Sequence, residues 1–173
     1  MKINWEALSK KLGVLQADGS ELYSGQSMQA LEEILGVEWI QNTIDYFIEG
    51  GKGNELAIKT IRRIGSNKAA DYTYLLFETY KETDIQKASL ALWAMNEVRM
   101  PKCIDFAEVV IENPKFSGIA LSIVRNLIFD YCLVFKETKL YEILDKFDVS
   151  FNEDITVLKT FVTNEFRKYE NGN

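Results

Sequence analysis

The chain has 173 residues, of which 47% are hydrophobic and 27% charged, and its formal net charge is −6. This length and residue usage are typical of one folded domain with a real core, and they exclude a disordered chain. The sequence contains no histidine, which excludes Ser-His-Asp and Cys-His catalysis and the usual zinc sites. We therefore expect no enzyme activity, no bound metal and no cofactor.

The net negative charge indicates which kind of partner to expect, and the N-terminal residues indicate the cellular compartment. Proteins bind phosphate backbones through Lys and Arg, so the net negative charge opposes nucleic acid and favours a basic protein partner. Residues 1–6 lack the apolar core of a signal peptide, and no apolar run is expected to approach the length of a membrane span. Cys103 and Cys132 fit no metal spacing and are expected to be buried, reduced thiols. The chain is thus predicted to be cytoplasmic, without membrane contact.

Only two prolines and ten glycines occur, and so few breakers favour long helices over short strands. Asp84 is the expected N-cap of one helix, and Pro101 suits the first turn of the next. Residues 50–53 are an expected turn, because a phosphate-binding loop needs a preceding strand and a Gly-Lys-Ser/Thr ending. The spacing of apolar residues and stop signals predicts an all-α chain with helices over 4–12, 27–35, 37–49, 54–64, 68–80, 84–98, 101–112, 115–131, 138–147 and 152–169.

Several of these helices share an apolar stripe that recurs at a nearly constant interval. Ala57, Ala88 and Ala120 are 31 and 32 residues apart. A small alanine lets the two helices of a pair approach closely, so the pattern predicts stacked helix pairs. The remaining members of the pattern are apolar as well: Ile61, Leu92 and Val124, then Ile64, Met95 and Leu127, and in the preceding helices Ile44, Leu75 and Phe106.

The chain resembles the HEAT-like helical repeat family over roughly residues 37–132. In residues 57–70 a helix ending in Ile-Gly leads through a short polar turn into the next helix, and residues 84–93 repeat the opening of a second helix. The Val-Arg pair that often begins second helices in that family is missing. The resemblance implies a right-handed α-α superhelix, a short solenoid whose concave face binds a partner. Residues 1–36 and 133–173 would then be helical caps of a single domain, 1–173.

Positions 62, 93 and 125 occupy the same slot in successive second helices, offset from the buried stripe. An Arg-Trp-Arg ladder there would anchor a partner, because Trp and Arg dominate interface hot spots and form cation–π pairs. The alternative is that Trp93 packs between repeats and that the arginines are solvated. With a polar rim from neighbouring residues, the predicted partner-binding residues are Lys59, Arg62, Arg63, Trp93, Asn96, Glu97 and Arg125.

Three further clusters could carry chemistry, and each has a simpler explanation. A basic cluster at residues 59, 62, 63 and 68 could contact nucleic acid, but it lacks the clustered aromatic residues of a stacking platform, so a solvated helix face is favoured. The acid pairs at residues 32–33 and at 145 and 148 are expected on solvated faces. Core packing is the expected role of four aromatic residues on one helix: Tyr72, Tyr74, Phe77 and Tyr80.

These features favour a non-catalytic protein-binding module over other classes of protein. The sharpest version is a bacterial immunity or antitoxin-type inhibitor, since an acidic inhibitor would attract a basic toxin by electrostatic steering. That version rests on analogy at the level of the fold. The alternatives are a nucleic-acid-binding or DNA-repair HEAT-like protein and, third, an enzyme or chaperone for a bound chromophore.

Overall fold

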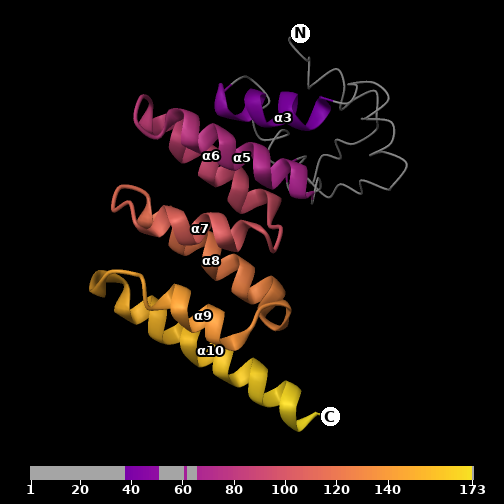
Figure 1. Cartoon of the computed structure of the whole chain (residues 1–173), viewed down its shortest axis with the longest axis vertical. Helices are drawn as coiled ribbons and strands as arrows, with labels where there is room; N and C mark the ends of the chain where they lie inside the picture. The colour runs from indigo at the N-terminus through magenta and orange to yellow at the C-terminus, as the bar shows by residue number, and fades with distance from the viewer. Residues whose placement is uncertain (1–37, 51–60, 62–65, 173) are drawn as a thin grey trace, which may run out of the picture. The chain divides into compact units, whose positions relative to one another are not determined.

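The computed structural model describes residues 38–50, 61 and 66–172 (Figure 1). Every regular element within these ranges is a helix, which confirms the all-α class. The chain divides into two compact units, Met1–Val98 and Arg99–Asn173, and each is described by itself. The superhelical stack and the predicted cap boundaries after residues 36 and 132 remain predictions.

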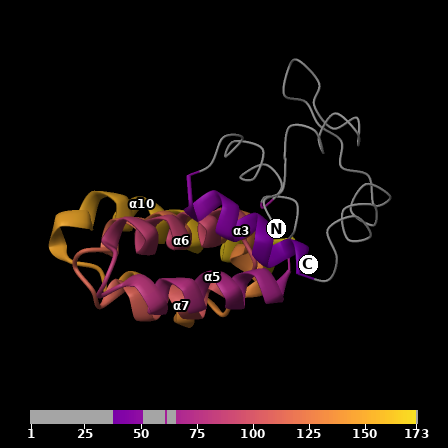
Figure 2. The same cartoon turned by 90° about the horizontal axis from the view of Figure 1, so that it is seen from above.

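The described part of the first unit contains helices α3 (Trp39–Ile48), α5 (Asn67–Tyr80) and α6 (Ile85–Val98). Helix α5 packs against α6, and α3 contacts both. Figure 1 shows α5 and α6 side by side below α3. In the view from above in Figure 2, α5 and α6 lie next to each other without overlapping. The three helices together surround the cleft described below.

Side-chain caps fix the starts of α5 and α6. The Ser66 hydroxyl accepts a hydrogen bond from the backbone N–H of Ala69 at 3.1 Å. The Asp84 carboxylate accepts one from the backbone N–H of Lys87 at 3.0 Å. Each cap pairs one of the backbone donors that a helix N-terminus leaves unsatisfied. The predicted Asp84 cap is therefore confirmed.

The apolar stripe predicted for the second helices is buried wherever the structure describes it. Its described members are almost entirely shielded from solvent: Ile61, Ala88, Leu92, Met95, Ala120, Val124 and Leu127. Ala57 and Ile64 lie outside the described residues. Burial of both described alanines fits the close helix approach that a small side chain permits.

The stripe predicted for the preceding helices is wrong at Leu75. Ile44 is fully buried, but Leu75 is 58% exposed. Helix α5 buries a different face, with Ala70, Thr73 and Phe77 at spacings of three and four residues. Because one residue turns a helix by about 100°, Leu75 lies far around α5 from Phe77.

The second unit is built from four α-helices and two short 3₁₀ turns within the described residues. Helix α7 packs against α8, and α10 contacts α8, α9 and both 3₁₀ turns. Pro101 lies in the turn just before α7 and not inside it, and Pro114 follows its end. The elements are α7 (Cys103–Ile111), α8 (Ser117–Tyr131), η1 (Cys132–Val134), α9 (Glu137–Leu144), η2 (Val149–Phe151) and α10 (Asn152–Asn171).

Both cysteines lie in this unit, and both are buried free thiols, as the sequence predicts. Burial raises the pKa of Cys132 to about 11, with smaller contributions from Glu165 and Glu137. A thiol with a raised pKa is a poor nucleophile, because the thiolate is the reactive form. Cys132 is therefore a buried thiol that stays protonated near neutral pH.

The segment Ser117–Val134, which comprises α8 and η1, is long and apolar enough by length and composition to cross a membrane. The expectation that no apolar run reaches this length is therefore wrong. Core helices of soluble proteins meet the same criterion, and α8 has fully buried side chains such as Val124 and Ile128. Composition alone does not decide the compartment, and a cytoplasmic location remains a prediction.

Glu108 on α7 links this helix to Lys139 of α9 and to Lys146 in the turn that follows α9. Its carboxylate accepts hydrogen bonds from Lys139 and from Lys146, the latter at 2.7 Å. The bond from Lys139, followed by that from Lys146, lowers the pKa of Glu108. An acid whose folded pKa is lowered stabilises the fold above its unfolded pKa of about 4.3, and this contribution is lost as pH falls through the folded pKa.

We expect Glu108→Gln to lower the free energy of unfolding by about 1 kcal/mol near pH 7, because both ion pairs are lost. The difference from the natural chain should vanish below the folded pKa, where Glu108 is protonated. Urea denaturation at a series of pH values measures it. Glu142→Gln, an exposed acid on α9, is the control, with an expected change within about 0.5 kcal/mol throughout. A loss in Glu108→Gln that does not vary with pH would contradict the ion pairs.

Candidate functional site

Trp93 lies on the solvent-facing side of α6 and is 43% exposed. Ile85 is exposed and Ser89 half-buried on the same helix. Residues four apart share one face of a helix, so these three form a continuous surface, here called the α6 stripe. The core of the first unit therefore does not enclose Trp93.

The remaining predicted partner-binding residues fall into three groups. Arg125 on α8, in the second unit, is exposed and forms no ion pair with any described residue. Asn96 and Glu97 are only 5% and 9% exposed, which contradicts their expected place on an open polar rim. Their burial depends on which residues cover the C-terminal end of α6, and the spacing of residues along one helix cannot predict this. Three basic residues lie outside the described residues: Lys59, Arg62 and Arg63.

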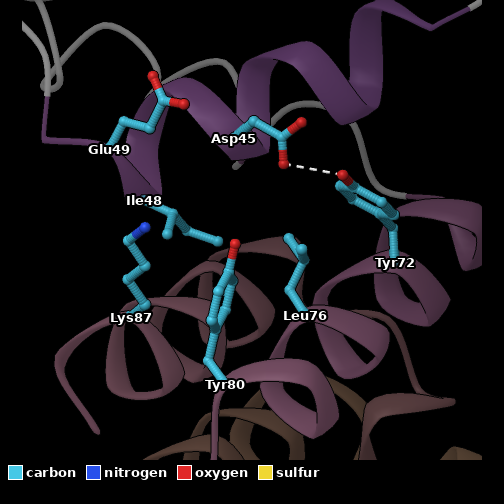
Figure 3. Close-up of a pocket in the computed structure, with 7 residues that line it drawn as sticks. All are labelled: Asp45, Ile48, Glu49, Tyr72, Leu76, Tyr80 and Lys87. Carbon is cyan, nitrogen blue, oxygen red and sulfur yellow. Dashed lines mark hydrogen bonds between the residues drawn. The ribbon is translucent and has the colours of Figure 1, made fainter. Parts of the chain in front are cut away.

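A cleft of about 220 Å³ opens between α3, α5 and α6 in the first unit (Figure 3). It is lined by two carboxylates, two tyrosines, one lysine and two aliphatic side chains, none of which is among the predicted site residues. We call it the Asp45 cleft. Its lining residues are Asp45, Ile48, Glu49, Tyr72, Leu76, Tyr80 and Lys87.

A hydrogen bond between Asp45 and Tyr72 closes one side of the cleft. The Tyr72 hydroxyl donates to Asp45 Oδ1 at 2.8 Å. Partial burial raises the pKa of Asp45, the bond from Tyr72 lowers it, and the charge of Glu49 raises it. Burial, followed by the bond to Asp45, raises the pKa of Tyr72, so Tyr72 stays a protonated donor. The second carboxylate oxygen of Asp45 accepts no hydrogen bond from a described residue and can accept further bonds.

Tyr80 and Lys87 form the opposite side of the cleft. The Lys87 ammonium lies 5.1 Å from the centroid of the Tyr80 ring, which is within cation–π range. Figure 3 shows the Tyr80 hydroxyl pointing between Ile48 and Leu76, with Lys87 on the Glu49 side. The cleft thus presents acceptors from α3 and aromatic rings from α5. No Ser, Thr or Cys nucleophile is among the seven lining residues.

Sequence reasoning missed the Asp45 cleft although part of its pattern was visible. Tyr72, Leu76 and Tyr80 are spaced by four residues and share one face of α5. The sequence predicts core packing for both tyrosines, yet both are only half-buried. Asp45 lies 27 residues before Tyr72 on another helix, so no local pattern could join them.

A second exposed apolar surface lies in the second unit, where α8 passes into η1. Phe129 on α8 meets Phe161 of α10 edge to face, with ring centroids 4.8 Å apart. Phe129, Leu133 and Val134 are all exposed. Contiguous exposed apolar side chains are typical of surfaces that contact other molecules.

Comparison with known proteins assigns no relatives to this chain. No family model, no curated protein and no solved structure matches it. The resemblance to HEAT-like repeats therefore stays a prediction from the sequence, and the functional interpretation rests on the residues of the chain itself.

Proposed function

We propose that this chain is a non-catalytic protein-binding module that contacts its partner through the α6 stripe. The observation that carries the proposal is the 43% exposure of Trp93, at a position that helical spacing offsets from the buried stripe of α6. Tryptophan combines a large apolar surface with one hydrogen-bond donor, and it is enriched at the energetic centres of interfaces. Covering Trp93 and Ile85 with a partner would remove their apolar surface from water, which is favourable.

The partner proposed is a basic protein. The formal net charge of −6 favours encounter with a positively charged surface. In its most specific form, the chain is a bacterial immunity or antitoxin-type inhibitor whose HEAT-like helix pairs stack into a short superhelix. In that arrangement α6 would be a second helix of a pair and the α6 stripe part of the concave face.

We expect Trp93→Ala to weaken binding of the partner at least about tenfold, a loss of roughly 1.4 kcal/mol. The partner is first identified as a stoichiometric protein retained by the tagged full chain, and titration calorimetry with purified partner then gives the dissociation constant. The matched control is Leu75→Ala, which removes an exposed apolar side chain from α5 of the same unit. This control should change the dissociation constant less than about twofold.

Three results would oppose the proposal. The first is unchanged partner binding by Trp93→Ala, and the second is an equal loss in Leu75→Ala. The third is retention of nucleic acid alone, with the strong salt dependence of phosphate contacts. Thermal unfolding of each variant separates lost binding from lost folding, because exposed substitutions usually change stability by less than about 0.5 kcal/mol.

A further inference from the structure

The Asp45 cleft holds two carboxylates, and no ammonium or guanidinium group of the described residues lies within ion-pair distance of either one. Among the described residues, neither Asp45 nor Glu49 forms an ion pair. The lysine that lines the cleft, Lys87, has its ammonium over the Tyr80 ring. A cation placed between Asp45 and Glu49 would therefore relieve their mutual repulsion.

The size of the cleft restricts what can enter it. Its volume of about 220 Å³ lies below the range of small-molecule pockets, which begins at roughly 300 Å³. A cleft of this size suits the end of one side chain better than a whole metabolite. The Tyr72 and Tyr80 rings and the aliphatic Ile48 and Leu76 offer a surface against which a flat, weakly hydrated group can lie.

We propose that the Asp45 cleft receives an arginine side chain of the protein partner. The guanidinium is planar and carries five donors, which suits the free oxygen of Asp45 together with the carboxylate of Glu49. Its face also stacks on aromatic rings, whereas an ammonium is a compact and strongly hydrated charge. The claim that this arginine belongs to a protein partner rests on the proposed protein-binding function. Binding of a guanidinium group in the cleft can be tested without the partner.

The test uses Nα-acetyl-arginine methylamide as the probe and the isotope-labelled full chain in solution. We expect saturable NMR shifts of the backbone amides of Asp45, Tyr72 and Tyr80. Asp45→Asn should weaken binding about tenfold, because a charge-assisted hydrogen bond contributes roughly 1.5 kcal/mol. The amide oxygen of this variant can still accept the bond from Tyr72, which preserves the local geometry. Glu49→Gln is a second variant in which we expect weaker binding.

The controls remove charge elsewhere or change the probe. Glu82→Gln removes one negative charge from an exposed residue outside the cleft, and binding should stay within about twofold of the natural chain. The lysine analogue should bind more weakly than the arginine analogue. Equal shifts with the glutamine analogue, equal binding by Asp45→Asn, or no saturable shift up to the solubility limit of the probe would overturn the inference.

Failure of this inference and failure of the proposed function give different results. Loss of partner binding in Trp93→Ala without any probe binding supports the protein-binding function and overturns the arginine cleft. A second outcome is probe binding that depends on Asp45 together with partner binding that Trp93→Ala leaves unchanged. This outcome supports the arginine cleft and opposes the α6 stripe as the binding surface. Once the partner is identified, Asp45→Asn should weaken partner binding as well as probe binding. An unchanged affinity for the partner overturns the inference.

Discussion

Phe116→Ala should destabilise the protein by about 3–5 kcal/mol, the cost typical of removing a buried phenylalanine ring. Phe116 precedes the first residue of α8 and is fully buried. Its carbonyl also accepts the backbone N–H of Ala120 at 2.9 Å, so the residue joins the start of α8 to the core of the second unit. Because small proteins are stable by only about 5–15 kcal/mol in total, a loss of this size should be evident.

Urea denaturation followed by far-UV circular dichroism measures this loss. The chain divides into two compact units, so the loss should be read from the transition to which the second unit contributes. Val149→Ala is the control, since Val149 is 75% exposed in the same unit, and its effect should stay within about 0.5 kcal/mol. Similar effects of both substitutions would show that the Phe116 ring is not a core element.

Ala120→Leu should destabilise the protein by about 1–3 kcal/mol through overpacking. Ala120 is fully buried on α8, the helix that packs against α7. Adding three carbon atoms at a close-packed position forces neighbouring side chains or helices to shift. This substitution tests the central claim drawn from the repeating alanines, namely that a small side chain is required there for two helices to approach.

Gly118→Ala is the matched control for Ala120→Leu, because it enlarges a residue of the same helix in open space. A Cβ atom at Gly118 would meet nothing within 4 Å. Alanine favours a helix over glycine by roughly 0.8–1.0 kcal/mol, so this variant should be as stable as the natural chain or more stable. Both are measured by urea denaturation, and a neutral or stabilising Ala120→Leu would refute close packing at Ala120.

The proposed binding surfaces lie apart from the residues that maintain the fold. Trp93 is exposed and Asp45 is half-buried, whereas Phe116 and Ala120 are fully buried. Substitutions of the first pair should therefore change affinity with little loss of stability, and those of the second pair should do the reverse. This separation makes the functional tests interpretable even though no catalytic reaction is expected.

Within the described residues, the sequence alone determined the helical class, most helix positions and the buried stripe of the second helices, whereas the predicted helices over 4–12, 27–35 and 54–64 lie almost wholly outside them. The predicted Asp84 cap is present, and the described stripe members from Ala88 to Leu127 are buried. These features are local, because caps depend on residues three apart and the stripe depends on the period of a single helix. The same reasoning offset Trp93 from the stripe of α6 but left two alternatives, an exposed partner contact or packing between repeats.

Only the tertiary structure decided which helix faces are covered and which side chains meet across helices. Leu75 fits an apolar repeat yet is exposed, and Glu97 is charged yet buried. Asp45 meets Tyr72 from 27 residues away, and Glu108 meets Lys139 from 31 residues away. Helical periodicity describes the faces of one helix, whereas burial and long-range pairing depend on which other helix lies against each face. The Asp45 cleft is a product of that packing, and no single segment of the sequence encodes it.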